Sequence, residues 1–199
     1  MAKNSQNTPS SLKNLISPNL KVLSSKILKD GDELRLIGGL VRDYLADKKN
    51  TTAKKLDYDL ACKFLPEETL KILKQHKIKA LPTGIKHGTI TALIGNEEYQ
   101  ITTLRKDVEN FGRHAKVEFV DDFFEDAKRR DFTINAMSID FNGQLYDYFD
   151  GLKDLKAGNV CFIGDAETRI GEDYLRILRF FRFNAKYGKN IDRFGKNIS

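Results

Sequence analysis

The spacing of apolar residues predicts helices and strands in turn along the chain. Leu20, Leu23 and Ile27 recur three and four positions apart, the spacing of one helical face, and predict a helix over 18–29. Alternation of apolar and polar residues predicts half-buried strands over four segments: 33–37, 56–62, 88–94 and 99–104. Because the chain mixes both kinds of element, we expect an α+β fold.

Turn residues and helix signals complete the set of elements. Gly95-Asn96 separates two of these strands, and Asn142-Gly143 lies between the alternating segments 137–141 and 144–148, so each dipeptide predicts a hairpin. Pro66 predicts the start of another helix. Further helical patterns cover 40–46, 121–137 in two pieces, and 168–187.

Four segments lack a regular pattern. They are a loose tail over 1–11, a polar loop over 50–55, a mobile loop over 105–116 that contains Gly112, and a linker over 150–164. The predicted architecture is a mixed sheet with helices, followed by a basic helix.

The composition excludes several protein classes. The 199 residues have a mean hydropathy of −0.47, and no apolar run reaches the roughly 18 residues that a membrane helix needs. Cys62 and Cys161 form neither a CxxC pair nor a disulfide framework, and no secretory signal is present, so we expect a cytoplasmic protein without a membrane partner. His76, His87 and His114 show no ligand spacing, and no zinc site is expected.

The net charge of +6 is concentrated at the two ends of the chain. Residues 1–30 carry +4 and residues 169–199 carry +5, which leaves the middle at −3. Basic ends favour a partner that bears phosphate groups. The alternative is a solvated lysine-rich surface, which we prefer for the N-terminal part. Charge alone also fits a basic RNA-binding module that has no catalytic activity.

Two carboxylates are expected to share one face of a strand. Asp57 and Asp59 are two positions apart in an alternating segment, so they point to the same side while Tyr58 points to the other. Such a pair repels itself unless a cation lies between the two groups. Mg²⁺ prefers a few carboxylates together with substrate phosphate oxygens, and paired metals activate a hydroxyl and neutralise pyrophosphate. The alternative is a chance pair on a solvated face.

A strand that runs into Gly38-Gly39 and then a helix suggests an anion site. Glycines let the backbone approach a bound anion, and the start of the helix presents free N–H groups. Arg42 is placed to bind a phosphate, next to Asp43. The alternative is an ordinary turn with an exposed arginine.

A second basic motif follows in the middle of the chain. Arg129 and Arg130 can hold phosphates, and Asp131 can accept hydrogen bonds from ribose hydroxyls, which would select ribonucleotides. The alternative is that Asp131 caps the N-terminus of a helix and that the two arginines simply lie on the surface.

The last motif pairs an acid with a base three positions later. Asp173 and Arg176 are expected to be neighbours on one helix face. Cytosine and adenine each offer an amino donor beside a ring-nitrogen acceptor. An aspartate can accept from the amino group while an arginine donates to the ring nitrogen, whereas guanine and uracil lack this pair of groups. Arg179 and Arg182 extend the basic strip. The alternative is a simple surface ion pair.

Five motifs occur in an order that resembles the class II tRNA nucleotidyltransferases, or CCA-adding enzymes, and the bacterial poly(A) polymerases of the same family. They are GGLVRD, LDYDLA, RRDFTINAM, DGLKDL and EDYLRILRFFRF, and the resemblance covers about 33–188. It implies a nucleotidyltransferase head related to DNA polymerase β, a mixed sheet with helices, over 31–152. The head would follow a basic tail and helix over 1–30. A linker and a truncated helical neck would occupy 153–199, without the rest of the neck, the body and the tail.

The resemblance also implies roles for the motif residues. Two Mg²⁺ ions would be held by Asp57 and Asp59. The triphosphate, the sugar and the base would contact the following residues: Gly38, Gly39, Arg42, Asp43, Arg129, Arg130, Asp131, Asp173, Arg176, Arg179 and Arg182. The segment 105–116 would be the flexible element used when the enzyme changes from C to A.

The expected reaction is template-independent transfer of CMP and AMP from CTP and ATP to the 3′ end of tRNA. The alternatives are a poly(A) polymerase and a catalytically weak or inactive nucleotide-binding remnant. Gln100 stands near a position that is usually acidic in the family, which favours the remnant. The short neck favours a split enzyme whose missing body is supplied by a second polypeptide.

Overall fold

The computed structural model describes residues 5–7, 15–28, 34–46, 57–111 and 114–189. Within this part, eight strands form one sheet in the order β1-β10-β9-β2-β3-β6-β5-β4. Their bounds are Ser5–Asn7 (β1), Leu34–Ile37 (β2), Tyr58–Cys62 (β3), Lys79–Gly84 (β4), Thr89–Ile94 (β5), Glu97–Thr103 (β6), Ser138–Asp140 (β9) and Gln144–Tyr146 (β10). Strands β3 and β6 run parallel and the other neighbours antiparallel, so the sheet is mixed as predicted.

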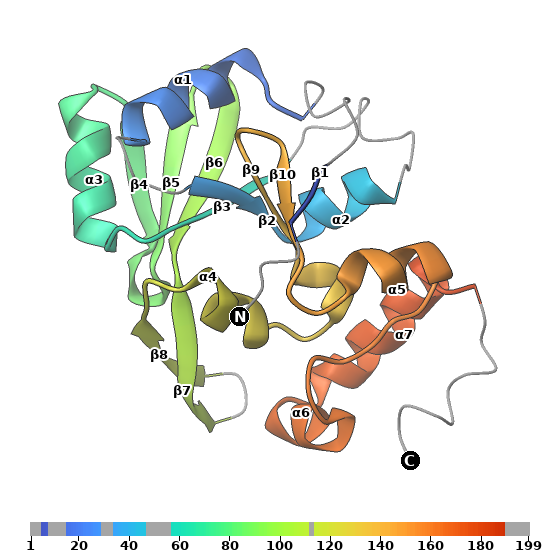
Figure 1. Cartoon of the computed structure of the whole chain (residues 1–199). Coiled ribbons are helices and arrows are strands. Elements are labelled where there is room, and N and C mark those ends of the chain that lie inside the picture. The colour runs from blue at the N-terminus through green and yellow to red at the C-terminus, as the bar shows by residue number, and fades with distance from the viewer. Residues whose placement is uncertain (1–4, 8–14, 29–33, 47–56, 112–113, 190–199) are drawn as a thin grey trace.

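The helices lie in two groups around the sheet (Figure 1). Helices α1 and α3 contact each other, and α3 packs on β4, β5 and β6, whereas α5, α6 and α7 gather at the opposite side of the molecule. The bounds are Pro18–Ile27 (α1), Gly39–Leu45 (α2), Pro66–Gln75 (α3), Phe123–Lys128 (α4), Gly151–Ala157 (α5), Ala166–Glu172 (α6) and Leu175–Tyr187 (α7), with short 3-10 helices at Ile85–His87 and Thr133–Asn135.

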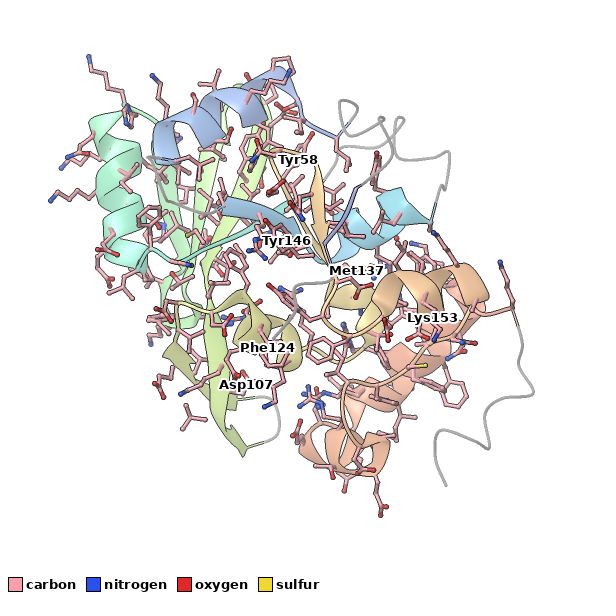
Figure 2. All side chains as sticks on the ribbon, viewed as in Figure 1. Tyr58, Asp107, Phe124, Met137, Tyr146 and Lys153 are labelled. Carbon is pink, nitrogen blue, oxygen red and sulfur yellow. The ribbon has the colours of Figure 1, made fainter. Side chains whose placement is uncertain are left out.

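A polar cluster anchors α1 to the strands beneath it. One carboxylate oxygen of Glu97 accepts hydrogen bonds from Ser17 (3.1 Å), Asn19 (2.7 Å) and Tyr99 (2.8 Å). Tyr99 is fully buried and stacks on Tyr58, with ring centroids 5.1 Å apart. Figure 2 labels Tyr58 where β3 passes under α1. The strand that carries Asp59 is therefore fixed from its other face.

Most predicted elements are present. The helix predicted over 18–29, the strands over 33–37 and 56–62, and the helix at Pro66 correspond to α1, β2, β3 and α3. Both predicted hairpins form, β5–β6 and β9–β10. The segment 121–137 begins with α4, but its second piece is the 3-10 helix rather than an α-helix. The predicted loop over 50–55 lies outside the described residues.

The loop predicted over 105–116 is not observed, because the described residues of this segment lie in two strands. Strands β7 (Arg105–Phe111) and β8 (His114–Phe119) pair antiparallel in a separate two-stranded sheet. Its side chains are largely polar, and Val108 is half exposed. The segment 105–116 contains few apolar residues, so its sequence shows no apolar alternation from which a strand could be predicted.

The C-terminal third also differs from the prediction. The expected linker over 150–164 contains α5, whose first amides at Gly151 and Leu152 donate to the Asp147 carboxylate at 2.8 and 2.9 Å. The predicted helix over 168–187 is two helices, because Asp173 adopts an extended conformation between α6 and α7.

The predicted loose tail over 1–11 is also corrected in part. Ser5–Asn7 form β1, which pairs antiparallel with β10 at the edge of the sheet. The remaining residues of that segment lie outside the described part of the chain.

We expect Gly151→Ala to destabilise the protein by about 1–3 kcal/mol, the usual cost of overpacking a core position. A Cβ at Gly151 would lie 2.3 Å from the backbone carbonyl oxygen of Thr133, which cannot move freely, and 3.1 Å from the Met137 side chain. Gly171→Ala is the matched control, because its Cβ would meet nothing within 4 Å. Urea unfolding measures both variants, and equal midpoints would contradict this account of α5 packing.

Candidate active site

A cavity of about 380 Å³ is lined by residues from distant parts of the chain. The lining residues are Gly38, Gly39, Arg42, Asp107, Arg129, Arg130, Asp131, Asn135, Asp173, Arg176, Arg179 and Phe183. Arginines outnumber aspartates in this lining, which suits an anionic ligand. The turn after β2, the segment after α4, and the α6–α7 junction thus meet at one site.

Gly38 lies where the cavity meets the carboxylates of β3. Its φ of +72° is in the left-handed region that favours glycine. A Cβ there would lie 3.7 Å from both Arg130 Nη1 and Asp59 Oδ2, so these two side chains flank the glycine on the cavity side. Asp59 therefore lies at the edge of the cavity, although it is not a lining residue.

The two carboxylates lie at the start of β3, Asp57 just before the strand and Asp59 within it. Tyr58 is buried on the far face, while Asp57 is exposed and Asp59 is half-buried. Burial raises the pKa of Asp59, Arg130 opposes this, and the charge of Asp57 adds to the rise. Among the described residues, neither carboxylate accepts a hydrogen bond. A half-buried carboxylate without such a partner, beside a second one, fits a divalent cation.

The neighbour of Asp59 on the next strand is an amide. In the parallel register of β3 and β6, Asp59 lies opposite Gln100, so both side chains project from the same face. Gln100 is exposed. The sheet therefore offers a neutral amide, and not a third carboxylate, beside Asp59.

A buried aspartate holds the two arginines of the central motif. Asp126 pairs with Arg129 Nε at 2.9 Å and with Arg130 Nη2 at 3.0 Å, and it also accepts from the amide of Arg105. Burial by itself would raise the pKa of Asp126, but the charges of Arg130 and Arg129 outweigh it and hold that pKa below its usual value. Asp126 thereby orients both guanidiniums at the cavity.

Asp131 is a junction between the cavity and α7. One of its oxygens accepts from the amide of Phe132 and from Asn135 Nδ2 at 3.0 Å, and the other accepts from Arg179 Nε at 2.6 Å. Asp131 is not an N-cap, because Phe132 has that position in the 3-10 helix. The carboxylate therefore orients side chains in the cavity wall.

Arg42 is buried where α2 meets α7. Its Nη1 donates to Asn135 Oδ1 at 2.6 Å and its Nε to Asp43 at 3.0 Å, and its guanidinium lies 4.8 Å from the ring centroids of both Phe183 and Tyr187. Arg42 lines the cavity, whereas Asp43 does not.

Asp43 instead joins the two helices. Its carboxylate accepts from Tyr187 Oη and from Lys186 Nζ. Burial raises the pKa of Asp43, but the hydrogen bond from Tyr187 and the charge of Arg42 outweigh it and lower that pKa. The sequence prediction placed Asp43 near the triphosphate, and the geometry makes it a partner of α7.

Asp173 and Arg176 both line the cavity, but not as one helix face. Asp173 follows α6 and accepts from the amide of Leu175, while Arg176 lies in the first turn of α7. Arg176 Nη1 donates to Glu172 and to the carbonyl of Arg169. The two residues therefore meet at one cavity because of the break between α6 and α7, and not because they are neighbours on a single helix face.

The cavity brings together most of the predicted ligand-binding residues, and it excludes Arg182, which is exposed on α7. Asp107, Asn135 and Phe183 line it and were not predicted as site residues. Asp107 was missed because β7 reads as a loop, and Phe183 because an aromatic residue in a helix indicates a core position. Asn135 lies within the central motif RRDFTINAM, and this position is the signal from which it could have been predicted as a site residue.

No helix in the described part of the chain is long and apolar enough to span a membrane. The same residues contain no cluster of three or more histidine, cysteine, aspartate or glutamate side chains suited to a metal ion.

Comparison with known proteins identifies relatives of this chain. The family model of the poly(A) polymerase head domain matches residues 34–161. The human mitochondrial CCA tRNA nucleotidyltransferase 1 is 46% identical over 182 residues, which is 91% of this chain and 40% of that protein. The CCA-adding enzyme of Lactobacillus helveticus is 41% identical over 164 residues, 81% of this chain and 39% of that protein. The chain thus spans about 40% of the length of these curated relatives.

Solved structures show the same likeness. A Bacillus stearothermophilus CCA-adding enzyme in complex with CTP superposes with a TM-score of 0.71 at 30% identity, covering 88% of this chain and 39% of that one. A tRNA nucleotidyltransferase complexed with a primer tRNA and an incoming ATP analog gives a TM-score of 0.61 at 30% identity, covering 81% of this chain and 43% of that one. The observed mixed sheet with helices is therefore the nucleotidyltransferase head that the sequence predicted.

Proposed function

Because this chain belongs to the poly(A) polymerase head-domain family, with CCA-adding enzymes among its relatives, we propose that it transfers CMP and AMP from CTP and ATP to the 3′ end of tRNA. One observation carries the proposal. The cavity is lined by Arg130, close to the Asp59 carboxylate at its edge, and also by Asp173 and Arg176. A nucleoside triphosphate needs these two kinds of contact, one for phosphates and one for the base.

The phosphate end of the site uses charge. Arg42, Arg129 and Arg130 line the cavity and bind the triphosphate, and Gly38 lets its oxygens approach the backbone. Asp57 and Asp59 would hold Mg²⁺, which when bound activates the RNA 3′ hydroxyl and neutralises the leaving pyrophosphate.

The sugar and base ends use directed hydrogen bonds. Asp131, already oriented by Arg179 and Asn135, keeps lone pairs that can accept from a ribose hydroxyl. Asp173 accepts from the amino group of cytosine or adenine, and Arg176 donates to the adjacent ring nitrogen. Guanine and uracil present a carbonyl and a ring N–H at those atoms and are rejected.

Incorporation of labelled nucleotides tests the proposal. The purified chain, Mg²⁺ and a tRNA that ends before CCA are combined separately with each of the four ribonucleoside triphosphates. We expect C and A to be incorporated and G and U not. Incorporation of A alone supports the poly(A) polymerase alternative, and equal incorporation of all four contradicts base selection by Asp173 and Arg176.

The alternative of a catalytically weak or inactive remnant is favoured by one observation, the neutral Gln100 opposite Asp59 in the β3–β6 register. A carboxamide binds Mg²⁺ less well than a carboxylate does. Tight Mg²⁺-dependent binding of ATP or CTP without turnover supports the remnant. Turnover that Asp57→Ala abolishes rejects it.

A second polypeptide is the further partner that we propose, and its contact surface is the apolar face of α7. Leu178 and Phe181 are 66% and 53% exposed there, and Tyr174 is 75% exposed just before the helix. Contiguous exposed apolar groups favour association in water. A partner polypeptide that presents an apolar face of its own would cover them.

We therefore expect the isolated chain to self-associate at high concentration, and Leu178→Gln with Phe181→Gln to shift it towards monomer. Light scattering over a concentration series measures the effect. The matched control is Lys153→Gln on α5, a polar exchange on an exposed residue (Figure 2). A sharp monomer peak for the unmodified chain at high concentration would count against this surface.

A further inference from the structure

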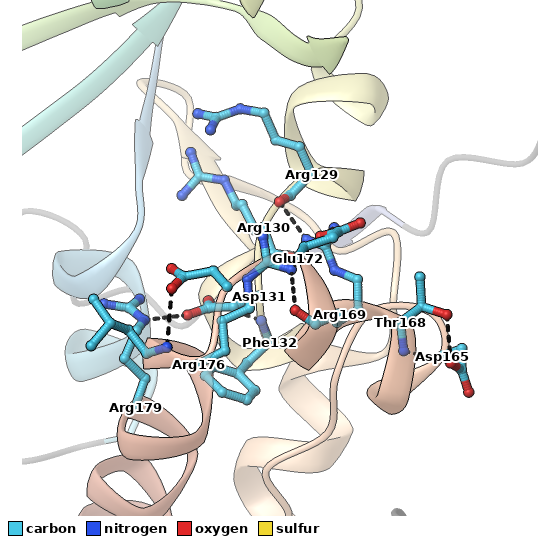
Figure 3. A network of polar contacts seen from close by, with 12 residues as sticks. Arg129, Arg130, Asp131, Phe132, Asp165, Thr168, Arg169, Glu172, Arg176 and Arg179 are labelled. Carbon is cyan, nitrogen blue, oxygen red and sulfur yellow. Dashed lines mark hydrogen bonds and ion pairs between the residues drawn. The ribbon is translucent and has the colours of Figure 1, made fainter. Parts of the chain in front are cut away.

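Arg169 on α6 connects two parts of the site without lining the cavity. Its Nη2 donates to the carbonyl oxygens of Arg129 and Arg130 at 2.6 and 2.8 Å, and its Nη1 donates to Glu172 at 2.6 Å. Only 12% of its side chain is exposed. Figure 3 shows Arg169 next to the segment that carries Arg129 and Arg130, with Glu172 one turn later on the same helix.

The first pair of contacts explains why an arginine stands at this position. The carbonyls of Arg129 and Arg130 follow directly on α4, where the last carbonyls of a helix lack intrahelical partners and carry partial negative charge. The Arg169 guanidinium supplies donors and positive charge to them. It thereby holds α6 against the segment from which the phosphate-binding arginines project.

The second contact leads to the base-reading side of the cavity. The Glu172 oxygen that accepts from Arg169 also accepts from Arg176 Nη1, and Arg176 donates to the Arg169 carbonyl at 2.8 Å. Asp173 follows Glu172 directly in the chain. One network therefore runs from Arg129 and Arg130 through Arg169 and Glu172 to the residues that face the base.

We propose that Arg169 is a positioning residue for base selection. It acts through Glu172 to fix the separation between the phosphate-binding arginines and the Asp173–Arg176 pair. The inference rests on the proposed function, because it assumes that this cavity binds a nucleotide. With Arg169 removed, the triphosphate contacts stay in place, but α6 is no longer held in register with α4. The preference for C and A over G and U then falls.

Equilibrium binding tests this inference without requiring turnover. The full chain with Mg²⁺ is titrated with CTP, ATP, GTP and UTP, and with inorganic tripolyphosphate as a probe of the phosphate contacts alone. For Arg169→Met we expect the ratio of CTP to UTP affinity to fall about tenfold, with tripolyphosphate affinity nearly unchanged. Lys153→Gln is the control and keeps the unmodified ratio.

Two further variants keep the test decisive if Arg169→Met fails to fold in thermal melts. Arg169→Lys keeps the charge but replaces the planar two-nitrogen fork by a single nitrogen, which cannot match both the Nη1 and the Nη2 contacts. Glu172→Gln keeps the shape but loses the charge that holds Arg169 and Arg176. We expect both to lower the CTP to UTP ratio. A purely structural role would instead lower the affinity for all five ligands by the same factor.

The outcomes separate the two claims. If the unmodified chain binds none of the nucleotides, the proposed function fails and the inference fails with it. If it prefers CTP and ATP and the folded Arg169 and Glu172 variants keep that preference, or lose affinity for all five ligands equally, the inference is overturned while the proposed function stands.

Discussion

Asp59→Asn is expected to lower nucleotide incorporation by about a thousandfold or more, while the protein still folds and binds the triphosphate. Loss of a metal-binding carboxylate removes several kcal/mol of transition-state stabilisation, and each factor of ten corresponds to about 1.4 kcal/mol. Arg42, Arg129 and Arg130 remain in the cavity, so tripolyphosphate still binds. Single-turnover incorporation with the four nucleotides measures the loss.

The fold is not expected to suffer from this change. Burial raises the pKa of Asp59, so the native state binds a proton more readily than the unfolded chain does. The ionised carboxylate therefore costs stability above its raised pKa, and an amide removes that cost at neutral pH. Thermal melts at pH 7 without Mg²⁺ should show an equal or higher Tm for Asp59→Asn.

Asp121→Asn is the matched control, since it neutralises an exposed carboxylate outside the cavity. It should leave incorporation unchanged. An Asp59→Asn variant that incorporates C and A at the unmodified rate would remove the carboxylates of β3 from the mechanism.

Asp126→Asn is expected to cost on the order of 3 kcal/mol of stability at pH 7, the usual effect of breaking a buried ion pair by removing one partner. Asp126 is 4% exposed and pairs with both Arg129 and Arg130, whose charges would be left without compensation. The two guanidiniums also lose their orientation at the cavity, so we expect weaker tripolyphosphate binding.

The effect has a defined pH dependence. The pKa of Asp126 is lowered in the folded state, so its contribution to stability is complete above the unfolded carboxyl range of about 4 and is lost as the pH falls through the lowered pKa. Urea unfolding at a series of pH values should therefore show the difference between Asp126→Asn and the unmodified chain shrinking below about pH 4.

Glu125→Gln on the same helix serves as the control for Asp126. Glu125 is half-buried on α4 and its side chain forms no ion pair among the described residues, so its replacement should cost little. Equal stability of Asp126→Asn and Glu125→Gln at pH 7 would show that the arginine pair does not depend on Asp126.

The sequence predicted those elements whose pattern is local. Alternation predicted that Tyr58 points away from Asp59, and Tyr58 does pack against Tyr99 on the buried side of β3. The turn dipeptides predicted two hairpins because Gly95 and Gly143 adopt positive φ. Each of these depends on a few adjacent residues.

Features held by distant partners could not be predicted in this way. The β7–β8 hairpin is defined by pairing between its two strands, and α5 depends on amides that donate to Asp147. The break between α6 and α7 at Asp173 leaves no apolar signature in the sequence. The charged residues on either side of it, Arg169, Glu172 and Arg176, pair with one another. The chemistry of the motif residues predicted which of them would act together, but the sequence did not predict the break that brings Asp173 and Arg176 to the cavity.

The most direct test of the account is a crystal structure of the chain with CTP and Mg²⁺. We expect the triphosphate against Gly38, Arg42 and Arg130, a metal ion at Asp57 and Asp59, and the cytosine edge at Asp173 and Arg176. A nucleotide bound outside this cavity, or one whose base points away from Asp173 and Arg176, would contradict it.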